Sequence, residues 1–285
     1  MNKIWTIGAL LQWTQQYFAG KGIDSPRLDA EILLAHVLHK ERIYLYAHYD
    51  EPMNGEELAA YRAMVKQRAD RLSVADILGT KAFMVLDFKV SEDVLIPRPE
   101  TEMLVETVVA AAEGTAPAII DIGTGSGAII LSLLHYLPQA TGKGVDISPK
   151  ALAIAAENGR TLGLDGRVTW IESDLFTKVP QGACDWLVSN PPYLTKGDME
   201  HLQPEVRHDP ALALYGGDDG LEFYRRIAAA SPAYVKAGGH CAVEIGAGQA
   251  DAVTAVFCRH GAYDHEQTVK DYGGIDRVLV FSRKE

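Results

Sequence analysis

Two stretches of this chain carry residues that could do chemistry, and each follows an apolar segment. The first is Asn190-Pro191-Pro192-Tyr193, which directly follows "DWLVS". Neither proline has a backbone N–H to donate, so the pair ends a strand and fixes the local backbone. The stretch is therefore either a strand terminator with an aromatic cap or a rigid corner rich in hydrogen-bond acceptors.

The second stretch, "AIIDIGTGSGAIILSLLHYL", predicts a strand, a glycine turn and a helix. Gly123, Gly125 and Gly127 lie at the turn, where glycine lets the backbone approach a ligand closely. Asp146 ends the next strand, where a carboxylate suits the two hydroxyls of a ribose. Gly123-x-Gly125-x-x-Ala128 also satisfies the relaxed dinucleotide fingerprint. The loop predicts a nucleoside-type cofactor, and a merely tight turn is the alternative.

The third predicted strand ends in "ESDLF", which places Asp174 and Leu175 at its carboxyl edge. Open α/β sheets bind ligands at that edge. Asp174 could accept hydrogen bonds from an adenine amino group, and Leu175 could pack on the ring. A surface aspartate at a strand end is the alternative. The segment Arg98–Thr101 precedes the first helix of this region and either caps that helix or reaches the rim of the site.

The elements that position these residues fall into three predicted parts: a helical domain over residues 1–82, a β-hairpin linker over 83–97 and an α/β domain over 98–285. In "DSPRLDAEILLAHVLHK", Ser25 and Pro26 start a helix whose predicted apolar face is Leu28, Ile32, Ala35 and Leu38. The aromatic-rich segment 41–52 is expected to pack in the core of this domain. Hairpin alternation over Lys81–Pro97 places the turn at Ser91-Glu92-Asp93.

From Arg98 onward, helical and β-branched segments alternate, which predicts an α/β fold with a largely parallel sheet. Six segments are expected to form its strands: "AIIDIG", "GKGVDIS", "RVTWIESD", "CDWLVSN", "GGHCAVEIG" and "DRVLVFS".

Composition narrows the classes of function. The chain has 285 residues and a net charge of -11, so it should repel nucleic-acid backbones, and no dense run of lysine and arginine is present. We therefore expect no direct nucleic-acid binding. The three dispersed cysteines fit a reduced, cytoplasmic compartment. No apolar run approaches the roughly 20 residues of a membrane span, so no membrane association is expected. Scattered histidines predict no metal site.

The ordered motifs "DIGTGSG", "GVDIS", "SDLF" and "SNPPY" resemble those of class I S-adenosylmethionine-dependent methyltransferases. The segments "SPRLDAEILLAHVL", "VLIPRPETE", "EVRHDPALALYGGDDGLEFYRRI" and "KDYGGIDRVLVF" narrow the resemblance to the peptide chain release factor glutamine methyltransferase family. It covers nearly the whole chain. The resemblance implies a mostly parallel, seven-stranded Rossmann-like sheet, preceded by a helical substrate-recognition domain and a β-hairpin linker.

The resemblance also implies an activity: methylation of glutamine N5 in the Gly-Gly-Gln loop of class 1 release factors, with S-adenosylhomocysteine as the second product. Carried over by motif, the cofactor contacts fall on Gly123, Thr124, Gly125, Ser126, Gly127, Asp146, Asp174, Leu175 and Asn190. The catalytic and substrate-binding residues fall on Asn190, Pro191, Pro192 and Tyr193.

The tetrapeptide suits a planar NH₂ group, whose two donors need two fixed acceptors. The Asn190 side-chain oxygen and the Pro191 carbonyl would supply them, and Tyr193 would lie flat against the amide. An adenine amine would meet the same requirement.

Several activities compete with this hypothesis. The nearest is methylation of a ribosomal protein glutamine, which "SPRLDAEILLAHVL" disfavours. A DNA adenine-N6 methyltransferase should need a basic face. A nicotinamide-dependent oxidoreductase would leave Asn190–Tyr193 without a role, and a non-catalytic cofactor-binding module would not need Asn190.

Overall fold

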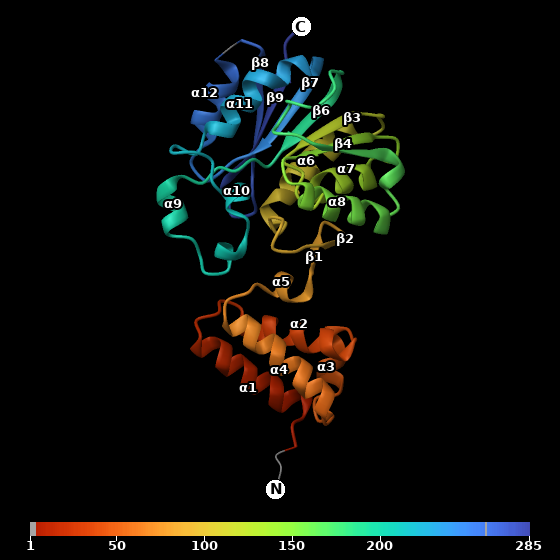
Figure 1. Cartoon of the computed structure of the whole chain (residues 1–285), viewed down its shortest axis with the longest axis vertical. Helices are drawn as coiled ribbons and strands as arrows, with labels where there is room; N and C mark the ends of the chain where they lie inside the picture. Colours follow the sequence, from red (N-terminus) through yellow and green to blue (C-terminus); the bar gives the residue numbers. More distant parts are fainter. Residues whose placement is uncertain (1–3, 260) are drawn as a thin grey trace. The chain divides into compact units, whose positions relative to one another are not determined.

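The computed structural model describes residues 4–259 and 261–285. The chain divides into two compact units, Met1–Gly79 and Thr80–Glu285. In the described part of the chain, no helix is long and apolar enough to cross a membrane. The first unit is helical: α1 Ile7–Gly20, α2 Pro26–Leu38, α3 Arg42–Ala47, α4 Gly55–Ala69 and α5 Val74–Leu78 (Figure 1). Its core includes Phe18, Leu33, Leu34, Leu45 and Tyr61.

Helix α2 begins at Pro26 as predicted, but its predicted apolar face was wrong. Of that face only Ala35 is buried, and Leu28 is 41% exposed. The buried side is formed by Asp29, Ala30, Glu31, Leu33 and Leu34. Both the predicted face and the observed face of α2 have apolar residues spaced three and four apart. The contacts of α2 with α1, α3 and α4 bury the observed face.

The buried carboxylates of α2 are neutralised by arginines. Asp29 pairs with Arg68 at 2.7 Å, and Glu31 pairs with Arg27 at 2.8 Å and with Arg42 at 2.6 Å. Such pairing is what permits a charged group inside a protein. A pattern of apolar residues alone cannot reveal it, because the partners lie up to 39 residues away.

The prediction of core packing for the aromatic-rich segment holds for only part of it. Leu45 is buried, whereas Ile43, Tyr46 and Tyr49 are 75%, 45% and 48% exposed. Helix α3 has only six residues, and Leu45 is the buried one among them.

The hairpin consists of β1 Thr80–Phe83 and β2 Leu86–Lys89. Its turn lies at Met84 and Val85, so the predicted turn at Ser91–Asp93 was wrong. Met84 takes the left-handed conformation that the tight turn requires, with φ of 55°. The buried amide of Asn158 then ties the hairpin to the glycine loop. It accepts from the Lys89 N–H at 2.8 Å and donates to the carbonyls of Lys89 and Ser126.

The second unit contains a seven-stranded sheet in the order β5-β4-β3-β6-β7-β9-β8. The first five strands are parallel, and β9 and β8 are antiparallel to their neighbours. The strands are β3 Ala118–Ile122, β4 Thr141–Asp146, β5 Val168–Glu172, β6 Cys184–Ser189, β7 Val235–Glu244, β8 Tyr263–Lys270 and β9 Asp276–Arg283. All six predicted strands are confirmed. The seventh, β8, escaped the pattern because it is a largely exposed, polar edge strand.

Helices cover both faces of this sheet (Figure 1). Helices α6 Glu102–Ala112, α7 Ala128–Tyr136 and α8 Pro149–Thr161 lie on one side, and α11 Glu222–Ala230 and α12 Ala250–Cys258 lie on the other. Each face has its own apolar core. The short helices α9 Lys196–Glu200 and α10 Ala211–Leu214 follow β6, and the 3₁₀ turns are η1 Pro99–Thr101, η2 Asp165–Arg167, η3 Val206–His208 and η4 Ser231–Ala233. The predicted α/β class is confirmed.

Candidate active site

The glycine loop joins β3 to α7 at the carboxyl edge of the sheet. Gly123, Gly125 and Gly127 have φ of 76°, 53° and 81°, a region that side chains disfavour. At Gly127 a Cβ would also lie 3.0 Å from the Leu131 side chain, so glycine is needed there for packing as well. The loop thus exposes backbone where a ligand can approach it closely.

The five predicted loop residues are placed differently. Gly123 and Gly125 line a cavity of about 410 Å³ that we call the glycine-loop cavity. Thr124 and Ser126 are buried, and the Thr124 hydroxyl donates to Asp121 at 2.6 Å. Gly127 starts α7. These three residues shape the loop from behind, and their contact with a cofactor stays a prediction.

Asp121, beneath the loop, is fully buried, and burial raises the pKa of its carboxyl to about 7. Its second oxygen, Oδ1, has no hydrogen-bond partner among the described residues. The hydrogen bond from Thr124 lowers the pKa of Asp121, but by less than burial raises it. Asp121 therefore supports the loop from inside and does not face the cavity.

Asp146, at the end of β4, lines the glycine-loop cavity beside the loop. Its carboxylate accepts from the N–H groups of Gly125 at 2.8 Å and Ser148 at 2.9 Å. Burial raises the pKa of Asp146, and these two backbone hydrogen bonds oppose the shift. The carboxylate thus holds the loop in place while it borders the cavity.

Asp174 and Leu175 follow β5 and line the same cavity. Leu175 has φ of 48°, an uncommon conformation for a branched residue. Asp174 pairs with Arg226 at 2.7 Å, an interaction that sequence reasoning did not identify. Arg226 and Phe223 of α11 complete this end of the cavity.

The tetrapeptide follows β6, next to the glycine loop. The Ser189 hydroxyl donates to the Ile122 carbonyl at 2.7 Å, which joins the ends of β6 and β3. Asn190 therefore stands beside Gly123, and with Pro191 and Pro192 it lines the glycine-loop cavity. Burial raises the pKa of the Tyr193 hydroxyl to about 12, so Tyr193 stays neutral.

The segment after the tetrapeptide is built for close backbone approach. A Cβ on Gly216 would lie 2.6 Å from the Pro192 carbonyl oxygen, and one on Gly220 would lie 2.4 Å from that of Tyr193. The Gln249 amide donates to the Tyr193 carbonyl at 3.2 Å. Both glycines and Gln249 thus hold the tetrapeptide in position.

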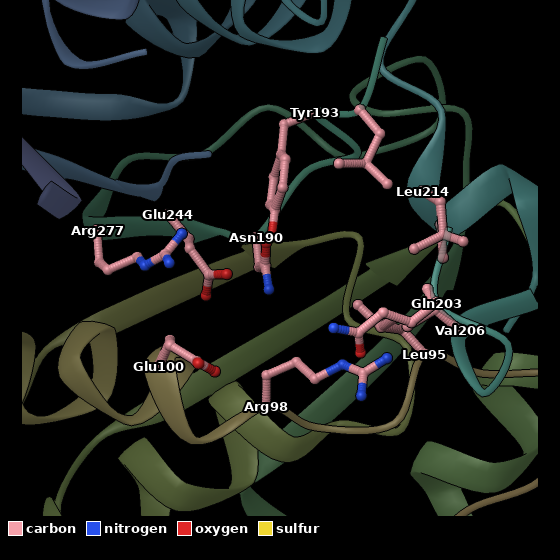
Figure 2. Close-up of a pocket in the computed structure, with 12 residues that line it drawn as sticks. Leu95, Arg98, Glu100, Asn190, Tyr193, Gln203, Val206, Leu214, Glu244 and Arg277 are labelled. Carbon is pink, nitrogen blue, oxygen red and sulfur yellow. The ribbon is translucent and has the colours of Figure 1, made fainter. Parts of the chain in front are cut away.

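A second cavity, of about 280 Å³, is also lined by Asn190 (Figure 2). We call it the Glu244 cavity. Its polar lining includes Arg98, Glu100, Asn190, Tyr193, Glu244 and Arg277. Asn190, Leu95 and Ala213 belong to the walls of both cavities. The two cavities therefore adjoin along these three residues, of which Asn190 is the polar one.

Sequence reasoning missed two of the four charged residues of the Glu244 cavity, Glu244 and Arg277. Burial raises the pKa of Glu244 to about 7, and the neighbouring Thr101, Arg277 and Asn190 oppose that shift. Arg277 pairs with Asp271 at 2.8 Å, and Arg98 pairs with Asp209. An acid at the end of a strand, in "CAVEIG", was a signal of the kind that identified Asp146, and it could have identified Glu244.

The segment Arg98–Thr101 contributes side chains to the site and does not cap the helix through Arg98 or Thr101. Neither Arg98 nor Thr101 makes a side-chain capping hydrogen bond at η1 or α6. Arg98 and Glu100 line the Glu244 cavity, and the Thr101 hydroxyl accepts from the Asn190 amide at 3.2 Å. In residues 4–259 and 261–285, no group of three or more His, Cys, Asp or Glu side chains could hold a metal ion.

The strand order with antiparallel β9 and β8, together with the glycine loop and the acidic strand ends beside a cavity, matches the class I methyltransferase fold. A methyltransferase from Pyrococcus furiosus shares this fold, with a TM-score of 0.56 and 16% identity over 79% of this chain and 98% of that one. Family models match residues 9–79 as a PrmC N-terminal domain and residues 99–206 as a methyltransferase small domain.

Relatives of known name narrow the class. Release factor glutamine methyltransferase from Geobacter sulfurreducens is 47% identical over 97% of this chain and 96% of its own length. The protein of the same name from Agrobacterium fabrum is 42% identical over 98% of both chains. The chain therefore belongs to the release factor glutamine methyltransferase family, and the predicted family is confirmed.

Proposed function

We propose that this chain transfers a methyl group from S-adenosylmethionine to the side-chain nitrogen N5 of glutamine in the Gly-Gly-Gln loop of class 1 release factors. One observation carries the proposal: Asn190 stands in the wall between the glycine-loop cavity and the Glu244 cavity. Leu95 and Ala213 also belong to both walls, and Asn190 is the shared residue whose side chain can hydrogen-bond to a group at the junction. Family membership supports the choice of substrate.

The glycine-loop cavity fits the cofactor. The backbone of Gly123 and Gly125 is open to the methionine part, and the Asp146 carboxylate would accept from the ribose hydroxyls. Asp174 and Leu175 would border the adenine. When bound, the sulfonium supplies an electrophilic methyl group that carries its own activation. The part left to the protein is to position the nucleophile.

The tetrapeptide would supply that position. A glutamine amide is a weak nucleophile with two N–H donors, so two fixed acceptors can orient it. The Asn190 Oδ1 and the Pro191 carbonyl would accept these hydrogens, and Tyr193 would exclude water from one face. In-line placement at about 3–3.5 Å is what such a transfer requires. S-adenosylhomocysteine and the methylated glutamine are the products.

We further propose that the first unit binds the body of the release factor. Its surface supports this role, because Trp13, Ile43, Tyr46 and Tyr49 are all exposed by 45% or more. Aromatic residues of this kind are enriched in protein–protein interfaces. The cytoplasm, where release factors act, is the proposed place of action.

A transfer assay with labelled S-adenosylmethionine tests the function. The acceptors are a purified class 1 release factor, its Gln→Ala variant in the Gly-Gly-Gln loop, ribosomal subunits and DNA. We expect label on the release factor alone and none on the loop variant. Label on ribosomal subunits would support the ribosomal alternative, and label on DNA would overturn the proposal.

A further inference from the structure

The orientation of the Asn190 side chain decides what it can bind. A carboxamide has a donor end, Nδ2, and an acceptor end, Oδ1. Only the acceptor end can hold an N–H group of a substrate amide. If the carboxamide were reversed, Nδ2 would hold the substrate's carbonyl oxygen instead. Some feature of the protein must therefore keep Nδ2 turned away from the substrate.

Thr101 provides the first part of that feature. Asn190 Nδ2 donates to the Thr101 hydroxyl at 3.2 Å, across 89 positions of sequence. Thr101 is 4% exposed, and it lies at the junction of η1 and α6, which holds its backbone in place. A hydroxyl can also donate, so Thr101 excludes the reversed carboxamide only when its own proton is directed to another acceptor.

Glu244 provides the second part. Its side chain is 2% exposed and stands at the end of β7, in the wall of the cavity that Asn190 also lines. The neighbouring side chains of Thr101 and Asn190 both lower the pKa of its carboxyl, against the effect of burial. Its Oε2 has no hydrogen-bond partner among the described residues. Figure 2 shows the Glu244 side chain between those of Arg277 and Asn190.

The three side chains form a directional chain. Asn190 donates to Thr101, and the Thr101 hydroxyl would then direct its one proton toward Glu244, whose pKa it lowers. A hydroxyl can accept and donate at the same time, and each bond strengthens the next. The charged neighbours that face Glu244 are Arg277 and Glu100, and Arg277 is already paired with Asp271. Glu244 is thus available to Thr101 and Asn190.

We propose that Thr101 and Glu244 are positioning residues that fix the carboxamide of Asn190, so that its Oδ1 faces the substrate. The nitrogen of the substrate amide, and not its oxygen, is then presented to the methyl group. Neither residue touches the reacting atoms. The inference rests on the proposed function for the identity of the substrate, but the orientation of Asn190 is measurable without any substrate.

Substitutions at Thr101 test the first link. Thr101→Val keeps the shape and removes the hydroxyl, and Thr101→Ser restores it. We expect Thr101→Val to lower kcat about 30-fold, because small misplacements of reacting groups are costly, with little change in KM for the release factor. Thr101→Ser should stay within about threefold of wild type. Thr107→Val is the matched control, since this hydroxyl donates to the Met103 carbonyl on the same helix.

Substitutions at Glu244 test the second link. Glu244→Gln retains an oxygen that can accept from Thr101 and Asn190, whereas Glu244→Leu has none. We expect the leucine variant to lose at least as much kcat as Thr101→Val, and the glutamine variant to lose less. Circular dichroism confirms that each variant is folded. The proposal is overturned if Thr101→Val keeps kcat within about twofold of wild type, or if serine and valine at 101 are equally impaired.

A second measurement is independent of activity. The chain has four asparagines, Asn2, Asn54, Asn158 and Asn190, so ¹⁵N-asparagine labelling gives few side-chain signals. Asn190→Asp identifies the signal of Asn190. We expect its N–H protons to exchange slowly with water in wild type and rapidly in Thr101→Val. Equal exchange in both proteins would overturn the proposal, even if the release factor were not the substrate.

Discussion

The two cavities that meet at Asn190 are built from different parts of the chain. The glycine-loop cavity is framed by residues that end successive parallel strands, and its loop is shaped by backbone conformation. The Glu244 cavity takes its charged groups from segments far apart in sequence, such as Arg98 before α6 and Arg277 on β9. The first is thus a property of the sheet, whereas the second depends on individual side chains and their partners.

Because of this difference, we expect the two cavities to respond differently to substitutions. A cavity made by strand ends tolerates change until the backbone itself moves. A cavity made by paired side chains responds to the loss of one hydrogen bond, because the remaining partner is buried. Asn190 is the polar residue that both walls share, so its removal should have the largest effect.

Asn190→Ala should lower kcat/KM for methyl transfer by about 10³-fold, because a fixed acceptor beside the reacting nitrogen is lost. Cofactor affinity, measured by calorimetry, should change by less than about tenfold, since the loop and Asp146 remain. Asn54→Ala, which removes a helix cap in the first unit, is the control. Near-normal methyl transfer by Asn190→Ala would contradict the proposed role of Asn190 at the junction of the two cavities.

Glu244→Gln should change the pH dependence of stability. The pKa of Glu244 is raised from 4.5 to about 7 in the folded protein, so folding favours its protonated form. The stability contributed by that preference is present below about pH 4.5 and is lost as pH rises through about 7. At pH 7.5 the glutamine variant should gain about 3 kcal/mol relative to wild type, compared with pH 4.

Urea unfolding of both proteins across this pH range measures that gain. Glu113→Gln changes an exposed carboxylate and is the control. Parallel curves for Glu244→Gln and wild type would show that Glu244 is not the buried acid described for this cavity.

Gly220→Ala tests the support of the tetrapeptide. Gly220 has φ of 71°, and its Cβ would lie 2.4 Å from the Tyr193 carbonyl oxygen. Because Tyr193 must move, we expect kcat to fall by about 10²-fold. Gly163→Ala is a matched control, since Gly163 has φ of 69° and nothing within 4 Å. If the two variants lose the same activity, backbone strain and not the close approach is responsible.

Asp146→Ala should affect the glycine-loop cavity alone. It removes the acceptor for the N–H groups of Gly125 and Ser148 and the proposed ribose contact. We expect the Kd for S-adenosylmethionine to rise about 10- to 30-fold, equivalent to roughly two hydrogen bonds. Release factor affinity should be unchanged. Asp165→Ala, on an exposed turn, is the control.

The contrast between the cavities also explains what was predictable. Asp146 and Asn190 could be identified because each directly follows an apolar strand, and parallel strands bring their carboxyl ends to one edge. Thr101 could not be assigned between capping and the site, because its partner Asn190 lies 89 residues away. Arg277 lies on an antiparallel strand, and nothing local indicates that it faces the site.

The same limit applies to the first unit. The spacing of apolar residues in α2 permitted two buried faces, and only the positions of α1, α3 and α4 decide between them. The hairpin turn at Met84 lacks glycine, asparagine and proline, the residues that usually mark turns. Long-range contacts, and not local preferences, decided both features.

A wall shared by two cavities has a consequence for how the ligands bind. Any shift of Asn190 caused by one ligand alters the surface that the other ligand meets. Thermodynamic linkage then requires reciprocity: the factor by which the cofactor changes release factor affinity equals the factor by which the release factor changes cofactor affinity. Both products differ from their parent molecules by the methyl group at this wall. In the proposed binding mode, the affinity of each cavity for its ligand therefore depends on whether the ligand in the other cavity carries the methyl group.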